Sequence, residues 1–135
     1  MGTLAIGEVA RRAGVRPSTL RFYEDAGLLE APPRVNKRRR YDPSVLHRLT
    51  VIQLAQQAGF TLAEIRTLFY GFPEGTPAGS RWQAMAQRKL AEVEELIARA
   101  HGMKRLLKTA LRCGCLTLED CALVTSRLAR PSPLT

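Results

Sequence analysis

The chain has 135 residues, enough for one domain of ordinary size or for a small domain with an extension. Hydrophobic residues make up 45% of it, which excludes a chain that is disordered by composition, and no apolar run approaches the roughly 20 residues of a membrane-spanning helix. The net charge of +9 favours a polyanionic partner, and charged residues near the N-terminus exclude a secretory signal, so we expect a cytoplasmic protein.

The N-terminal segment predicts two short helices joined by a tight turn. Ile6, Val9 and Ala10 recur at the spacing of one helix face, and a glycine ends that pattern. Pro17 suits the first turn of a second helix, which Gly27 closes as a left-handed cap. Two short helices joined by a glycine-containing turn are typical of a helix-turn-helix.

Residues 28–43 are rich in proline and arginine, lack helical periodicity and predict a β-hairpin. A basic hairpin after a helix-turn-helix indicates a winged domain that binds duplex DNA, with the second helix in the major groove and the wing on adjacent phosphates. Single-stranded RNA is disfavoured because few aromatic residues interrupt the basic run. The candidate DNA-binding residues are Arg16, Ser18, Thr19, Arg21 and Tyr23 of the second helix and Arg34, Arg38, Arg39 and Arg40 of the hairpin.

Two further helices complete this winged domain, which we assign to residues 1–70. Asp42 and Pro43 predict the N-cap and first turn of a third helix, whose inner face includes Leu49. The TLAE sequence from Thr61 to Glu64 is a capping box that opens a fourth helix.

A long helix follows a hinge. Residues 71–80 are rich in glycine and proline and predict the hinge loop, and residues 81–111 carry an apolar stripe at three- and four-residue steps. One helix cannot bury such a stripe on itself, so we expect a coiled-coil dimer rather than a helix folded back over the winged domain. The predicted dimer interface consists of Trp82, Leu90, Val93, Ile97, Met103 and Leu107.

All three cysteines, Cys113, Cys115 and Cys121, lie in a predicted loop of residues 112–125, before a tail of residues 126–135. An odd number of thiols in a reducing compartment disfavours a disulfide framework. Three neighbouring thiolates favour copper, zinc or mercury-like ions, or form an incomplete site for an iron–sulfur cluster. Thiol oxidation and inert packing are the alternatives.

Three stretches, IGEVARRAGVRPSTLRFYEDAGLL, RRRYDP and GFTLAEIRTLF, together resemble the MerR family of bacterial transcription regulators. The resemblance implies a mainly α fold, with a winged helix-turn-helix head, a long antiparallel coiled-coil dimerisation helix and a C-terminal effector loop. It also implies that Tyr41 joins the DNA contacts of the wing. Family members bind promoter DNA and, when triggered, bend and untwist it, which engages RNA polymerase indirectly.

Within that family, FPEG, Trp82 and CGCLTLEDC are most similar to the redox-sensing SoxR branch. Loops of that branch carry four cysteines, whereas Ala110 stands at the first of those positions here. An iron–sulfur cluster wants four thiolates or a substitute ligand. The expected cofactor is therefore a soft metal ion (copper, zinc or mercury-like) or an iron–sulfur cluster, with Ser80 of the partner subunit as a further candidate ligand.

The expected function is that of a dimeric promoter-binding regulator that responds to a soft metal ion or a redox signal. An enzyme is disfavoured, because no triad, paired-carboxylate or phosphate-loop constellation is present. The alternative is a cytosolic metal-buffering or metal-delivery protein with an incidental basic domain. The recognition helix and the wing arginines argue against that alternative, because a buffer needs neither.

Overall fold

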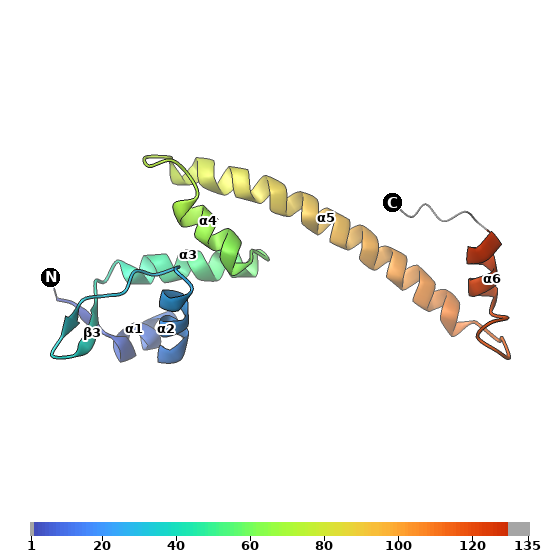
Figure 1. Ribbon diagram of the computed structural model, residues 1–135, viewed down its shortest axis with the longest axis horizontal. Helices are drawn as coiled ribbons and strands as arrows, with labels where there is room; N and C mark the ends of the chain where they lie inside the picture. Colours follow the sequence, from blue (N-terminus) through green and yellow to red (C-terminus); the bar gives the residue numbers. More distant parts are fainter. Residues whose placement is uncertain (1, 130–135) are drawn as a thin grey trace. The chain divides into compact units, whose positions relative to one another are not determined.

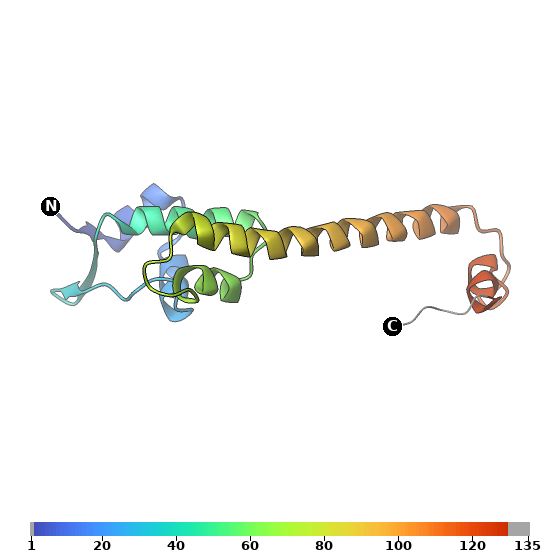
Figure 2. The same ribbon diagram turned by 90° about the horizontal axis from the view of Figure 1, so that it is seen from above.

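A computed structural model describes residues 2–129 of the chain. The chain folds as two units, an N-terminal unit, Met1–Lys89, and a C-terminal unit, Leu90–Thr135. Helix α5, Ala78–Leu111, runs without a break through the boundary between them (Figures 1 and 2). Within the described residues, no helix combines the length and the hydrophobicity needed to span a bilayer.

The helix-turn-helix is formed by α1, Ile6–Ala13, and α2, Pro17–Asp25, as predicted. Gly14 and Gly27 end the two helices with φ of +70° and +79°, the left-handed region in which glycine has no Cβ to strain. The Leu28 N–H closes the α2 end on the Tyr23 carbonyl at 2.9 Å. Helix α1 packs against both α2 and α3, so the recognition helix rests on a buried core.

The predicted hairpin is present as β2, Arg34–Val35, and β3, Arg38–Tyr41, which pair antiparallel with Arg34 opposite Arg39. Asn36 and Lys37 connect them with φ of +54° and +65°, the backbone of a tight hairpin turn. A third strand, β1, Leu4–Ala5, adds to β3 and gives the order β1-β3-β2. Sequence reasoning missed β1, because two residues are too few to show an alternating pattern.

The third and fourth helices are α3, Val45–Gln57, and α4, Leu62–Tyr70. Helix α3 begins at Val45, later than the expected start at Asp42 and Pro43. The Asp42 carboxylate instead accepts the Ser44 N–H at 2.9 Å in the turn before the helix, and this bond lowers the pKa of Asp42. The side chain thus caps a turn rather than the helix itself.

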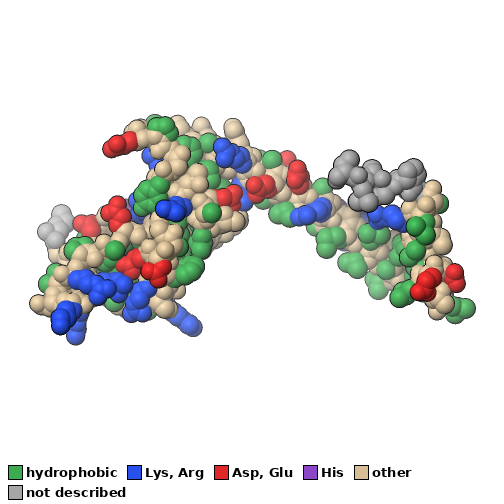
Figure 3. All heavy atoms as spheres, viewed as in Figure 1, with side chains coloured by type: hydrophobic (Ala, Val, Ile, Leu, Met, Phe, Trp, Pro, Cys, Tyr) green, Lys and Arg blue, Asp and Glu red, His purple; other side chains and the backbone are tan. Residues whose placement is uncertain are grey.

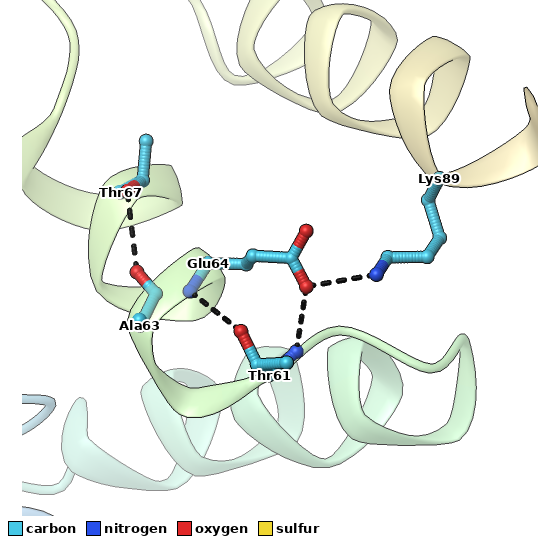
Figure 4. Close-up of polar contacts among 5 residues, drawn as sticks. All are labelled: Thr61, Ala63, Glu64, Thr67 and Lys89. Atoms are coloured by element: carbon cyan, nitrogen blue, oxygen red, sulfur yellow. Dashed lines mark hydrogen bonds and ion pairs between the residues drawn. The ribbon is translucent and has the colours of Figure 1, made fainter. Parts of the chain in front are cut away.

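The capping box of α4 is confirmed (Figure 4). The Thr61 hydroxyl accepts the Glu64 N–H at 3.2 Å, and the Glu64 carboxylate accepts the Thr61 N–H at 2.9 Å. The same carboxylate oxygen lies 2.8 Å from the Lys89 ammonium on α5, and that contact lowers the pKa of Glu64. The cap of α4 is therefore also an attachment point for α5.

Helix α5 begins at Ala78, three residues before the predicted start. Its first turns belong to the N-terminal unit: Met85 is 4% exposed, and the Trp82 ring meets Phe60 edge-on with centroids 6.3 Å apart. Trp82 was expected at the dimer interface, but much of its ring packs on the core of its own chain. The sequence pattern could not distinguish these two uses of one apolar stripe.

The C-terminal unit contains the rest of α5 and a short helix α6, Ala122–Ala129. Helix α6 occupies residues that were expected to form the end of the cysteine loop and the start of the tail. Residues 130–135 of the predicted tail lie outside the described part of the chain. The irregular segment between the two helices carries the cysteines.

Replacing Thr61 with Ala should lower the free energy of unfolding by about 1 kcal/mol, because the Glu64 N–H loses its capping partner. Urea denaturation measures the change. Thr67→Ala is the matched control on the same helix, since the Thr67 hydroxyl bonds the Ala63 carbonyl within the helix and is not a cap (Figure 4). Equal stabilities of the two variants would contradict the role of the cap.

Candidate DNA-binding surface and thiol cluster

A basic groove lies between the hairpin and the start of α1 and α2. Figure 3 shows Lys and Arg side chains gathered over the hairpin end of the N-terminal unit. The residues that line the groove include no carboxylate, whereas six are basic: Arg21, Arg34, Lys37, Arg38, Arg39 and Arg40. Such a surface attracts phosphates and releases their counterions on binding.

Four of the five residues predicted on the recognition helix lie on its outer side. Arg16, Ser18 and Arg21 are exposed, and Thr19 is half-buried. Arg16 precedes the first turn, and the Thr19 N–H bonds the Arg16 carbonyl at 2.9 Å. Side chains at the N-terminal end of a recognition helix are the ones that reach base edges in the major groove.

The wing arginines divide into two kinds. Arg34 and Arg38 are exposed on the hairpin. Arg40 is anchored, because its guanidinium donates to the Thr3 hydroxyl at 2.9 Å and to the Thr3 carbonyl at 2.8 Å. Arg39 is anchored on the recognition helix, with its Nε 3.3 Å from a Glu24 carboxylate oxygen.

Two of the predicted DNA contacts, Tyr23 and Tyr41, are buried in the structure. Their exposed fractions are 5% and 2%, and both belong to the core. The Tyr23 hydroxyl donates to Gln56 at 3.0 Å, and the Tyr41 hydroxyl donates to Glu24 at 3.3 Å. Burial, followed by the negative charge of Glu24, raises the pKa of Tyr41 to about 12. Both rings therefore pack in the core, and both hydroxyls donate to acceptors within the chain.

Glu24 is a residue of the site that sequence reasoning missed. Its carboxylate is 6% exposed and lies behind the basic groove, between Arg39 and Tyr41. Its Oε2 atom is buried and accepts no hydrogen bond from any residue that the structure describes. Most acidic residues in a short helix are exposed to solvent, so no pattern in the sequence indicated that Glu24 is buried.

The three thiols form one cluster in the C-terminal unit. The Cys113 sulfur lies 3.0 Å from that of Cys115 and 3.3 Å from that of Cys121, and all three sulfurs lie within 4.8 Å of one another. Cys113 and Cys115 are exposed, whereas Cys121 is buried. The cluster thus has one anchored sulfur and two that are open to solvent.

The turn before α6 holds this arrangement. The Thr117 hydroxyl donates to Asp120 at 2.9 Å and accepts the Asp120 N–H at 3.2 Å, which closes the chain between Cys115 and Cys121. The Ala122 N–H at the start of α6 donates to the Cys115 sulfur at 3.3 Å. This contact holds the Cys115 sulfur at the N-terminal end of α6.

The apolar stripe of α5 lies open within the C-terminal unit (Figure 3). Val93 is half-buried, and the other large side chains of the stripe are between 48% and 86% exposed: Leu90, Leu96, Ile97, Met103, Leu106, Leu107 and Leu111. Contiguous apolar surface of this kind marks a site of protein association.

The winged helix-turn-helix and its basic groove define a DNA-binding regulator, and comparison with known proteins identifies its family. The family model "MerR HTH family regulatory protein" matches residues 4–71, and the model "MerR, DNA binding" matches residues 46–110. The chain belongs to the MerR family of helix-turn-helix transcription regulators, whose members among its relatives are regulators rather than enzymes.

Two curated relatives cover most of the chain. It is 34% identical to the HTH-type transcriptional activator SoxR homolog of Chromobacterium violaceum, over 90% of this chain and 82% of that protein. It is 33% identical to the HTH-type transcriptional regulator CueR of Yersinia pestis, over 90% of this chain and 88% of that protein.

Among solved structures, the transcription regulator PbrR691 from Ralstonia metallidurans CH34, in complex with lead(II), has a similar fold. The TM-score is 0.72 at 30% sequence identity, and the match covers 92% of this chain and 98% of that one. The mainly helical fold with a winged head and a long helix is thus that of known family members.

Replacing Arg38 with Ala should weaken duplex-DNA binding and lower the slope of log K against log salt by about 0.9, the share of one phosphate contact. Melting of the protein should not change, because Arg38 is an exposed side chain. Arg66→Ala removes an exposed charge on α4, outside the groove, and is the matched control. Equal loss of affinity in both variants would indicate that the affinity depends on the net charge of the protein and not on a contact between the wing and a phosphate.

Proposed function

We propose that this protein is a dimeric, soft-metal-responsive transcription regulator that binds promoter duplex DNA and remodels it for RNA polymerase when the metal binds. The observation that carries the proposal is the three-thiol cluster at the end of α5, on a chain whose other unit is a DNA-binding head. Metal buffering alone does not account for a groove lined by six basic residues.

The open stripe of α5 supports the homodimer. Leucine, isoleucine and methionine side chains that are half or more exposed, such as Leu90, Ile97 and Met103, leave apolar area in water. Burial of such a side chain contributes about 1.5–3 kcal/mol. A second copy of α5 offers a stripe of the same spacing, as a coiled coil requires. Two heads on one dimer then suit two half-sites on one face of a duplex.

The cluster geometry supports a soft ion. Thiolate sulfurs lie about 2.3 Å from a bound zinc, so three of them around one ion are separated by about 4 Å. The sulfur separations of 3.0 Å and 3.3 Å need to open by at most about 1 Å to reach that distance. Soft thiolate ligands favour copper(I), zinc and similar ions over hard cations.

The donor count favours an ion over an iron–sulfur cluster. A cluster of that kind is held by four thiolates or by thiolates and a substitute ligand. The metal-ligating group in the described part of the chain consists of three cysteines, and Ala110 lies one turn of α5 before the first of them. Three sulfurs can hold a single soft ion, and zinc would take a further ligand such as water at its fourth position.

The first turns of α5 support transmission of the signal. Arg81 donates to the carbonyls of Leu68 and Phe69 at the end of α4, at 3.1 Å and 2.7 Å. With Met85 buried and Lys89 paired to Glu64, the start of α5 is fixed in the N-terminal unit. A change in how two α5 helices pack then moves two heads, provided that the dimer has two discrete arrangements.

Replacing Cys113 with Ser should lower the affinity for a thiophilic ion at least 100-fold, because Cys113 is the sulfur nearest to both others. Reduced protein purified without oxygen is titrated separately with copper(I), zinc(II), mercury(II) and lead(II). Thiolate charge-transfer absorption and competition with a chelator report binding. Operator affinity without metal should stay within twofold, whereas metal-induced transcription should be lost.

Thr109→Ala is the control for this titration, because the Thr109 hydroxyl donates to the Arg105 carbonyl within α5 and its removal leaves all three thiols in place. Its metal affinity should stay within a few fold of the original. Visible absorption bands together with acid-labile sulfide in the oxygen-free protein would contradict the single metal ion and indicate an iron–sulfur cluster instead. Absence of both metal binding and sulfide would leave thiol oxidation as the signal.

Replacing Ile97 with Glu should turn the dimer into a monomer at micromolar concentration, because it places a charge in the middle of the open stripe. Sedimentation velocity measures the change. Glu94→Gln, on the same turn of α5 but outside the stripe, is the control and should remain dimeric. A chain that is monomeric before any substitution would overturn the proposed dimer.

A further inference from the structure

The buried carboxylate of Glu24 has no role in the function proposed so far. It lies on α2, the recognition helix, and two residues of the wing strand β3 face it: Arg39 with its Nε at 3.3 Å from Oε2, and Tyr41 with its hydroxyl at 3.3 Å from Oε1. With 6% of its side chain exposed, Glu24 is nearly removed from water. A carboxylate in that position is costly unless a cation and hydrogen bonds compensate it.

The cation that compensates it is also a groove residue. The Arg39 side chain is 27% exposed and lines the basic groove. A guanidinium has five N–H donors in a rigid plane, and the contact with Glu24 engages the Nε side of that plane. Its terminal nitrogens make no hydrogen bond to the residues that the structure describes, and these are the donors that hold a phosphate in a two-point contact.

We propose that Glu24 is a positioning residue for DNA binding: it orients Arg39 so that the terminal nitrogens of the guanidinium bind a backbone phosphate beside the recognition helix. The inference rests on the proposed DNA interface and adds to it a residue that touches no DNA. An arginine held from behind loses less side-chain entropy on binding than a free one. Glu24 also fixes the wing to the recognition helix, so that the two elements meet the duplex in one register.

The test is Glu24→Gln, which keeps the shape and an oxygen acceptor for Tyr41 but removes the charge. The probe is a duplex that the original protein selects from a random pool, and affinity is measured by fluorescence anisotropy between low and moderate salt. The dissociation constant should rise about tenfold, and the slope of log K against log salt should fall by about 0.9, because one ordered phosphate contact is lost. The melting temperature should not fall, because a buried charge is removed.

Two further variants separate positioning from a merely structural role. Arg39→Gln should weaken binding similarly and also lower the melting temperature, because it leaves the Glu24 charge buried without its cation. The double variant of Glu24→Gln and Arg39→Gln should recover the melting temperature but bind DNA no better than Arg39→Gln alone. Glu8→Gln removes a carboxylate charge that is paired with Arg11 and Arg12 on α1, outside the lining of the groove, leaves Glu24 and Arg39 in place, and should bind within twofold of the original.

Binding of Glu24→Gln with unchanged affinity and salt slope would overturn the inference, and so would losses that add in the double variant. Neither result touches the proposed function, which fails separately if no sequence is enriched by selection with the original protein. In that case the salt slopes of the same variants are measured on random-sequence duplex, where phosphate contacts still contribute.

Discussion

The packing of α5 into the N-terminal unit is the interaction on which the rest of the structure depends. Met85 is buried in the core, Trp82 packs on Phe60, and Arg81 satisfies carbonyls at the end of α4 that the helix itself leaves open. The same helix goes on to present the open apolar stripe and ends at the thiol loop. One continuous element therefore has its beginning in the DNA-binding unit and its end at the candidate sensor.

The basic groove has a buried layer behind its exposed charges. Tyr41 and Glu24 lie beneath the wing, and Thr3 holds Arg40 from the neighbouring strand β1. Arginines held in this way resemble the preorganised donors of a rigid binding site more than a flexible basic tail. The exposed Arg34 and Arg38 supply charge, and the anchored Arg39 and Arg40 supply geometry.

The sequence predicted those elements whose signal is local and missed those that depend on tertiary contact. Gly14, Gly27 and the Thr61–Glu64 capping box mark helix ends by their own chemistry, and the structure has them as predicted. The burial of Tyr23 and Tyr41 could not be predicted, because an amphipathic ring suits a core and a phosphate contact equally well. The thiol cluster was visible in the spacing of the cysteines, whereas the support of its sulfurs by the start of α6 was not.

The length of α5 decides how a signal at the thiols can reach the DNA. A helix of 34 residues is about 50 Å long at 1.5 Å per residue, whereas charges in physiological salt are screened over about 8 Å. The effect of neutralising thiolates at one end is therefore screened well before the other end of the same helix. In the proposed regulator, a signal along one chain therefore depends on how the helix packs. The Glu64–Lys89 contact and the buried Met85 join α5 to the N-terminal unit, so a movement of the helix would reach that unit through them.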